Sequence, residues 1–269
     1  MQLPLTHTTK IVAHRGASYK APENTIASFK LAFEEYADFI EGDFWMTKDN
    51  EIVCIHDPHT KRVTNKKIKL NVISSTLHNL KQLDVGSWKG SEFEGSEIPT
   101  IQEIFKMIPA GKGIFIDVKD DREIFMQKLA EIIEQSFIPE DMIRIIAFNP
   151  NTVQLAKKYL PDIKAYWLFG WYFSKIKYII SLAQRKLIKA LNGIECDGVD
   201  LYAAPYIDEK LVKYLRYNDL DFCAYNVDKQ QDALKLITLG ADAITTDSPF
   251  MMRGVMEELG KDKNVFDNA

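Results

Sequence analysis

Three acidic residues of this 269-residue chain have the types and spacing of side chains that share one site. Glu41 and Asp43 are separated by one residue in the run IEGDF, and Asp117 lies in a second apolar run, IFIDVK. Residues i and i+2 of an extended segment face the same side, so Glu41 and Asp43 point together. Clustered carboxylates raise one another's pKa, and a cation that prefers oxygen ligands, such as Mg²⁺ or Ca²⁺, relieves the repulsion. The sequence therefore predicts a divalent metal site at Glu41, Asp43 and Asp117.

The alternative is that each of these carboxylates caps a helix or pairs with a lysine. That is the commoner role of a single ExD pair. The third carboxylate, on what would be the neighbouring strand, favours the metal site.

Two of the five histidines, His14 and His56, follow strand-like runs and fit general acid–base chemistry. Imidazole titrates near neutral pH, so a pair of histidines across one site can act as base and acid. A structural histidine bonded to a backbone carbonyl is the alternative for either one alone.

Arg15 and Lys119 bring positive charge to the same strand ends. An arginine forks onto two phosphate oxygens and a lysine adds a point charge, so both suit an anionic substrate. The alternative is an ion pair with one of the carboxylates. With a divalent cation the site is net positive, which suits a phosphate and almost equally a carboxylate.

The elements that must position these residues alternate between short β-branched runs and longer amphipathic runs. The expected strands are 10–13, 39–43, 113–119, 143–147, 163–168, 198–201, 221–225 and 243–246. The expected helices are 22–36, 101–107, 122–136, 150–159, 174–189, 206–217, 229–239 and 249–259. Parallel strands need crossover connections, so the pattern predicts an α/β fold and, at this length, a (β/α)8 TIM barrel. An open doubly wound sheet is the rival, but no GxGxxG follows the first strand.

One segment interrupts this alternation. Residues 51–56 form an expected extra strand, and residues 57–99 follow it with turn residues and without a clear helix before Ile101. We interpret 57–99 as a small insertion after strand two of a single domain spanning 1–269. In such barrels reactive residues lie at the C-terminal ends of strands, where His14, Glu41, Asp43, His56 and Asp117 all fall.

The overall composition excludes several classes of protein. Lys plus Arg is 34 and Asp plus Glu is 38, so the net charge is 34 − 38 = −4, which argues against a nucleic-acid partner. No apolar run approaches the roughly 20 residues of a membrane-spanning helix, and no signal peptide is visible. Three scattered cysteines fit neither a zinc cluster nor a disulfide framework. We expect a cytoplasmic protein with a small-molecule substrate and no stable membrane insertion; its oligomeric state is left open.

The segments HRGASYKAPENTIASFKLAFE, IEGDFWMTKDNEIVCIHD and IDVK together resemble the glycerophosphodiester phosphodiesterase family. The runs RVTN, DVGSW, IPTIQE, AYNVD and GADAITTDSP extend the resemblance over nearly the whole chain. HRG followed by PENT, then ExD, then HD is far more specific than any one of these motifs.

The resemblance implies a (β/α)8 barrel that hydrolyses glycerophosphodiesters to an alcohol and glycerol 3-phosphate with a divalent metal ion. By position, the metal ligands would be Glu41, Asp43 and Asp117, the acid–base pair would be His14 and His56, and the phosphate would meet Arg15 and Lys119. The residues of PENT would open the first helix and brace the site.

Two departures from the family pattern concern the ligands and the substrate pocket. Asp117 stands where a glutamate is usual, and its shorter side chain changes its reach toward the ion. Tyr225 stands where a tryptophan usually lines the substrate pocket, which predicts a smaller wall with a hydroxyl group and a different choice of head group.

Two other functions remain open from the residues. A lysophospholipase D on the same barrel would release lysophosphatidic acid, with the run YWLFGWYF at 166–173 lining an acyl-chain pocket. A non-catalytic barrel that binds a glycerophospho-ligand is the other, since fold alone does not establish activity.

Overall fold

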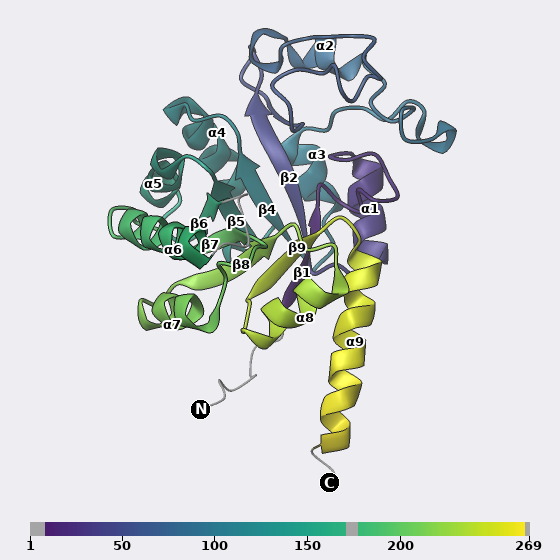
Figure 1. Ribbon diagram of the computed structural model, residues 1–269. Helices are drawn as coiled ribbons and strands as arrows, with labels where there is room; N and C mark the ends of the chain where they lie inside the picture. The colour runs from purple at the N-terminus through teal and green to yellow at the C-terminus, as the bar shows by residue number, and fades with distance from the viewer. Residues whose placement is uncertain (1–8, 171–176, 267–269) are drawn as a thin grey trace.

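The computed structural model describes residues 9–170 and 177–266, and within them eight parallel strands form a closed barrel surrounded by helices (Figure 1). Neighbouring strands run β1-β9-β8-β7-β6-β5-β4-β2, and a further β1–β2 pairing closes the ring. Val12 pairs with Phe39 and His14 with Glu41 across this closure. The predicted (β/α)8 TIM barrel is therefore confirmed.

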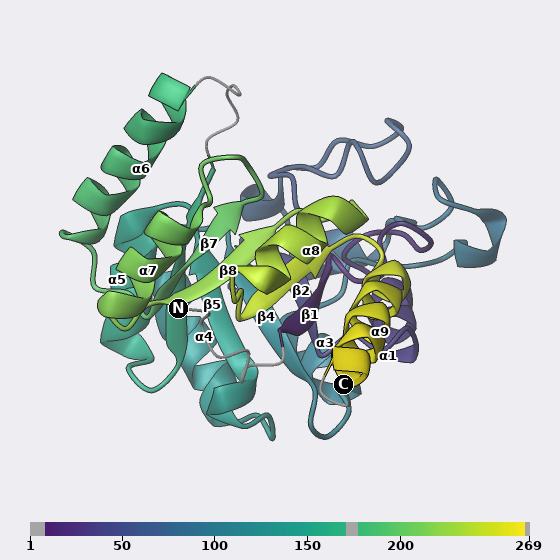
Figure 2. The same cartoon turned by 60° about the horizontal axis from the view of Figure 1, so that its bottom comes forward.

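The barrel strands and the helices after them alternate along the chain (Figure 2). The strands are β1 (Lys10–His14), β2 (Phe39–Met46), β4 (Gly113–Val118), β5 (Ile143–Ala147), β6 (Lys164–Phe169), β7 (Gly198–Tyr202), β8 (Asp221–Tyr225) and β9 (Ala243–Thr246). The helices are α1 (Ile26–Glu34), α2 (Leu77–Lys81), α3 (Ile101–Met107), α4 (Glu123–Glu134), α5 (Pro150–Tyr159), α6 (Lys177–Leu191), α7 (Glu209–Tyr217), α8 (Gln230–Thr238) and α9 (Pro249–Phe266). Among the residues described, no helix combines the length and apolar character needed to cross a bilayer.

Two apolar layers hold the barrel together. The larger lies between the sheet and the helices and contains Phe29, Ile40, Ile116 and Leu129. The smaller fills the barrel interior with residues such as Phe115. Because a strand alternates its two faces, β2 sends Ile40 to the outer layer and Glu41 into the barrel.

The turn between β1 and α1 differs from the expected helix over 22–36. The side chain of Thr25 accepts a hydrogen bond from the Ser28 amide and forms a capping box, so α1 begins at Ile26. Asn24 has a φ of 56°, a left-handed conformation that asparagine tolerates and that a helix excludes. Residues 22–25 therefore form a turn before α1 at the C-terminal end of the barrel.

The segment between β2 and α3 lies above the C-terminal end of the barrel (Figure 1). Strand β3 (Ile52–Cys54) pairs antiparallel with the extended end of β2 and is shorter than the strand expected over 51–56. Residues after it form a small apolar cluster around Val72 and Leu80. The expectation that 57–99 has no helix of its own is wrong, because α2 forms there. Five residues are too few to show a helical period in the sequence.

Gly16 provides a test of how tightly the β1–α1 turn packs. Its φ is +83°, and a Cβ there would lie 2.4 Å from Ser28 Oγ. Gly16→Ala is expected to lower the free energy of unfolding by roughly 2–3 kcal/mol, because it adds a clash to the strain of a left-handed alanine. Urea unfolding measures this loss.

Gly111→Ala is the matched control. Gly111 has a similar φ of +76°, and a Cβ there meets no atom within 4 Å. It is expected to cost about 1 kcal/mol, the backbone strain alone. An equal loss of unfolding free energy in the two variants would show that close packing against Ser28 does not contribute to the effect at Gly16.

Candidate active site

All eight residues predicted for the site line one cavity of about 160 Å³. They are His14, Arg15, Glu41, Asp43, His56, Asp117, Lys119 and Tyr225. The other lining residues are Ile146, Phe148, Leu168, Asp200, Asn226 and Thr245. A larger cavity of about 410 Å³ is lined by residues that begin strands, such as Lys10, Lys164 and Ala243. The cavity with the predicted residues lies at the other, C-terminal end, where such barrels place their chemistry.

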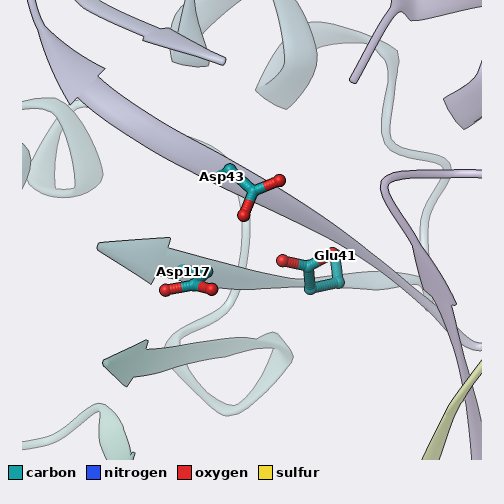
Figure 3. Close-up of side chains that lie close together, drawn as sticks. All are labelled: Glu41, Asp43 and Asp117. Carbon is teal, nitrogen blue, oxygen red and sulfur yellow. The ribbon is translucent and has the colours of Figure 1, made fainter. Parts of the chain in front are cut away.

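Glu41, Asp43 and Asp117 lie together, as Figure 3 shows, with Asp43 directly beside Asp117 in the β2–β4 register. One oxygen from each carboxyl group lies within 4.8 Å of the others, and all three side chains are buried. Asp117 joins the cluster although it is shorter than a glutamate by one methylene. Its Oδ1 atom is buried without a hydrogen-bond partner among the described residues.

The three carboxyl groups have unequal affinities for protons. Burial, together with the charge of Asp43, raises the pKa of Glu41 to about 8. Burial raises the pKa of Asp117 to about 6, although Lys119 opposes the shift. Burial alone would raise the pKa of Asp43, but Lys119 and Arg15 hold it well below its ordinary value. The three carboxyl groups thus repel one another, and Lys119 and Arg15 offset only part of this repulsion.

This donor set fits a hard divalent cation. Three carboxylates converge, one of their oxygens has no hydrogen-bond partner in the part of the chain that the structure describes, and two of them hold protons more tightly than usual. Mg²⁺ and Ca²⁺ both bind such oxygen ligands, and their charge offsets the repulsion.

The two basic residues are tied to the same carboxylates. Arg15 Nε lies 3.0 Å from Asp43 Oδ2, and the Arg15 amide donates a 2.9 Å hydrogen bond to Glu41 Oε2. Lys119 Nζ lies 2.5 Å from Asp117 Oδ2 and 3.0 Å from Asp43 Oδ1. The ion-pair alternative is therefore realised, and it also leaves both cations lining the cavity. Arg15 reaches this position through a left-handed φ of 54° at the end of β1.

His14 is held by Asp247, which directly follows β9. His14 Nδ1 lies 2.6 Å from Asp247 Oδ1, and Asn226 Nδ2 lies 2.7 Å from His14 Nδ1. A carboxylate can only accept, so Nδ1 donates and Nε2 is left for proton transfer. Burial alone would lower the pKa of His14, but the hydrogen bond to Asp247 and the charge of Glu41 raise it overall.

His56 is held by a second aspartate, its neighbour Asp57. The distance from His56 Nδ1 to Asp57 Oδ1 is 2.7 Å. Burial lowers the pKa of His56 and outweighs the opposing charge of Asp43. The two imidazoles therefore have the same kind of support and opposite pKa shifts.

Three further residues link the two histidine-bearing loops. Arg62 donates to Asp57 and to Glu23, and Glu23 also accepts from Arg15 at 3.0 Å. Asn24 donates a 2.8 Å hydrogen bond to Asp43 Oδ2, which fixes that carboxylate. Glu23 and Asn24 of the PENT motif thus brace the site, as the resemblance implies.

Sequence reasoning missed several functional neighbours. Asp247 lies at a strand end and would have been found by the same rule that found His14. Arg62 lies in a polar stretch of the insertion with no local signal. Asp200 is an acidic residue between Val199 and Leu201 in a buried strand, and that mismatch with its apolar neighbours was a signal.

Aromatic residues form one wall of the cavity. Tyr225 contacts Phe148 edge-on with ring centroids 6.1 Å apart, and both line the cavity. Only part of the apolar run 166–173, which is predicted to line an acyl-chain pocket, lies in the described structure. Tyr166 and Trp167 are buried within β6, while residues 171–173 lie outside the described part of the chain.

A closed barrel with this charged cavity at its strand ends defines a (β/α)8-barrel enzyme. Residues 14–251 match the model of the glycerophosphoryl diester phosphodiesterase family. The chain therefore belongs to that family and is a phosphoric diester hydrolase.

Individual relatives agree with this assignment. A glycerophosphodiester phosphodiesterase of Caldanaerobacter subterraneus subsp. tengcongensis is 32% identical over 248 residues, which cover 90% of this chain and 95% of that protein. One from Bacillus subtilis is 27% identical over 272 residues, covering 91% and 85%. The structure of an Oleispira antarctica phosphodiesterase in complex with the product sn-glycerol-3-phosphate superposes with a TM-score of 0.78 at 28% identity, covering 92% of this chain and 96% of that one.

Asp247→Asn tests the support of His14. Losing the carboxylate is expected to lower the pKa of His14, as NMR titration of the metal-free protein would show. A histidine whose folded-state pKa is raised stabilises the fold below its unfolded value of 6.5, and that stabilisation is lost as the pH rises through the folded-state value. The variant should therefore lose about 1 kcal/mol at about pH 5, a figure that allows for solvent screening at half-exposed Asp247, and little at about pH 8.

Ser18→Ala is the control, because Ser18 bonds the same Asp247 oxygen at 3.0 Å without carrying charge. It is expected to shift the His14 titration far less. An unchanged titration in Asp247→Asn would mean that Asp247 does not set the pKa of His14.

Proposed function

We propose that this enzyme is a metal-dependent glycerophosphodiester phosphodiesterase that releases an alcohol and sn-glycerol 3-phosphate, with His14 and His56 as the acid–base pair. The observation that carries the proposal is that three buried carboxylates, two histidines and two basic side chains line one small cavity. The product bound to the Oleispira antarctica relative supports the choice of substrate. A cavity of about 160 Å³ suits a glycerophosphoryl group better than an acyl chain.

The carboxylate cluster would hold the cation through Glu41, Asp43 and Asp117. A bound Mg²⁺ or Ca²⁺ supplies Lewis-acid polarisation of the phosphate and a template for the glycerol hydroxyl. Arg15 and Lys119 bind the phosphate oxygens and stabilise the charge that develops on them. The Arg15 and Lys119 side chains are already fixed by ion pairs, so they need to move little during the reaction.

The two histidines move the protons. His14 takes the proton from the glycerol 2-hydroxyl, whose oxygen then attacks phosphorus, and His56 protonates the leaving alcohol. Water opens the resulting cyclic phosphate with the two roles reversed. The raised pKa of His14 makes it the stronger base, and the lowered pKa of His56 makes its protonated form the stronger acid.

Replacement of either histidine tests these roles. His14→Ala and His56→Ala are each expected to lower kcat for glycerophosphocholine at least about a hundredfold, since each removes one proton transfer. Release of glycerol 3-phosphate measures turnover, and circular dichroism confirms folding. His78→Ala, an exposed histidine of α2, serves as the control and is expected to retain activity. Near-normal kcat in either site variant would contradict the assignment.

Removal of the metal tests the carboxylate cluster. Exhaustive chelation is expected to abolish turnover, and Mg²⁺ or Ca²⁺ is expected to restore it. Glu41→Gln and Asp43→Asn should each weaken metal binding in calorimetry at least about tenfold, because each removes a charged ligand. Glu34→Gln, an exposed change in α1, controls for the loss of one negative charge. Full activity after chelation would refute metal dependence.

The same assay separates the proposal from its rivals. Turnover of lysophosphatidylcholine in preference to glycerophosphocholine would indicate a lysophospholipase D. Binding of both substrates without any product would indicate a barrel that only binds its ligand.

A further inference from the structure

Asp200 is a fourth carboxyl group in the cavity, and the metal cluster and the histidines do not account for it. It is the central residue of β7, it is 1% exposed, and it lines the cavity with Glu41 and Asp117. Both of its oxygens are buried without a hydrogen-bond partner in residues 9–170 and 177–266. A buried carboxyl group without partners destabilises the fold, so Asp200 calls for an explanation other than packing.

Asp43, on the other side of the cavity, has a full set of partners. Asp43 contacts Arg15, Lys119 and Asn24. Asp200 instead has apolar Leu168 and Cys223 beside it on the neighbouring strands. Burial and the charges of Glu41 and Asp117 raise its pKa well above the ordinary value. Because both oxygens are buried and no described residue forms an ion pair with them, the carboxyl group is held neutral and has one donor and one acceptor.

Thr245 offers a second unused polar group in the same cavity. Its Oγ1 atom is buried and has no hydrogen-bond partner within the described ranges. Thr245 comes from β9 and Asp200 from β7, whereas the carboxylate cluster and the basic residues come from β1, β2 and β4 or directly follow them. One side of the cavity is thus ionic, and the other is neutral and able to form hydrogen bonds.

We propose that Asp200 and Thr245 form a hydroxyl-binding subsite that takes the terminal hydroxyl of the substrate's glycerol moiety. This proposal rests on the proposed function, which places the phosphate against Arg15 and Lys119. A hydroxyl group both donates and accepts, so the neutral acid and the threonine together satisfy it. The subsite would select glycerol over a diol that lacks that hydroxyl, because the analogue leaves buried polar groups without partners.

The test compares two substrates that differ by one hydroxyl. Glycerophosphocholine has the terminal hydroxyl, and 2-hydroxypropyl phosphocholine lacks it but keeps the proposed nucleophile. Asp200→Leu is expected to lower kcat/KM for glycerophosphocholine about ten- to hundredfold and for the deoxy substrate far less, so that the preference collapses. Asp200→Asn, which keeps a donor and an acceptor, should retain most of the preference, and Thr245→Val should lose part of it.

Matched measurements distinguish this role from others. Cys223→Ala, the neighbour of Asp200 on β8, controls for disturbance of the barrel wall and should change neither substrate's kcat/KM. The Tm of Asp200→Leu should equal or exceed that of the wild type, since an unpaired carboxyl group is replaced by an apolar side chain. Equal losses on both substrates would overturn the proposal. Weaker metal binding in Asp200→Asn would also overturn it and would make Asp200 a metal ligand.

A binding assay keeps this test separate from the proposed reaction. If the wild type does not hydrolyse glycerophosphocholine, the proposed function fails, and calorimetry with sn-glycerol 3-phosphate and 2-hydroxypropyl phosphate still tests the subsite. A wild-type preference for the first ligand that Asp200→Leu abolishes supports the subsite. Equal binding of the two ligands, or no binding of either, overturns it.

Discussion

The repulsion among three carboxyl groups buried in one cavity is the constraint on which the rest of the site depends. Glu41, Asp43 and Asp117 cannot all ionise without compensation. The barrel compensates with Lys119 and Arg15 and leaves part of the charge unbalanced. That imbalance is the physical basis for the cation site that we propose. It also explains why a turn as tight as the one at Arg15 and Gly16 is kept at the end of β1, because it brings the Arg15 amide to Glu41.

The segment between β3 and α3 takes part in the same network. Arg62 joins the aspartate that holds His56 to the glutamate that pairs with Arg15. The Arg62 side chain is 41% exposed, whereas Glu23 and Asp57 are largely shielded, so loss of Arg62 would leave two shielded carboxylates without this partner. The loop that carries His56 is therefore positioned by the loop that carries Arg15. His14, at the end of β1, and His56, just after β3, are thereby held to one cavity.

The cavity is divided into regions of different chemistry. Strands β1, β2 and β4 with the residues that follow them supply charge, whereas β7 and β9 supply neutral groups, and Tyr225 and Phe148 supply an aromatic wall. This division matches a substrate with a phosphate at its centre and hydroxyl groups at one end. The unpaired polar groups that the division requires reduce stability, which is the usual trade between a functional site and the packing around it.

The sequence by itself determined the barrel and the cluster of three carboxyl groups. Strand periodicity and the i, i+2 spacing of Glu41 and Asp43 are local properties, and the rule that strand ends gather at one edge brought Asp117 and the histidines to them. Only the tertiary structure decided which side chains bind and position these site residues. Asp247 lies 233 residues from His14, and Arg62 lies 39 from Glu23. Spacing carries no information across such separations, because the contact depends on how the closed barrel stacks loops from distant strands. The same holds for Asp200, which has no hydrogen-bond partner among the described residues, a fact that only the folded structure reveals.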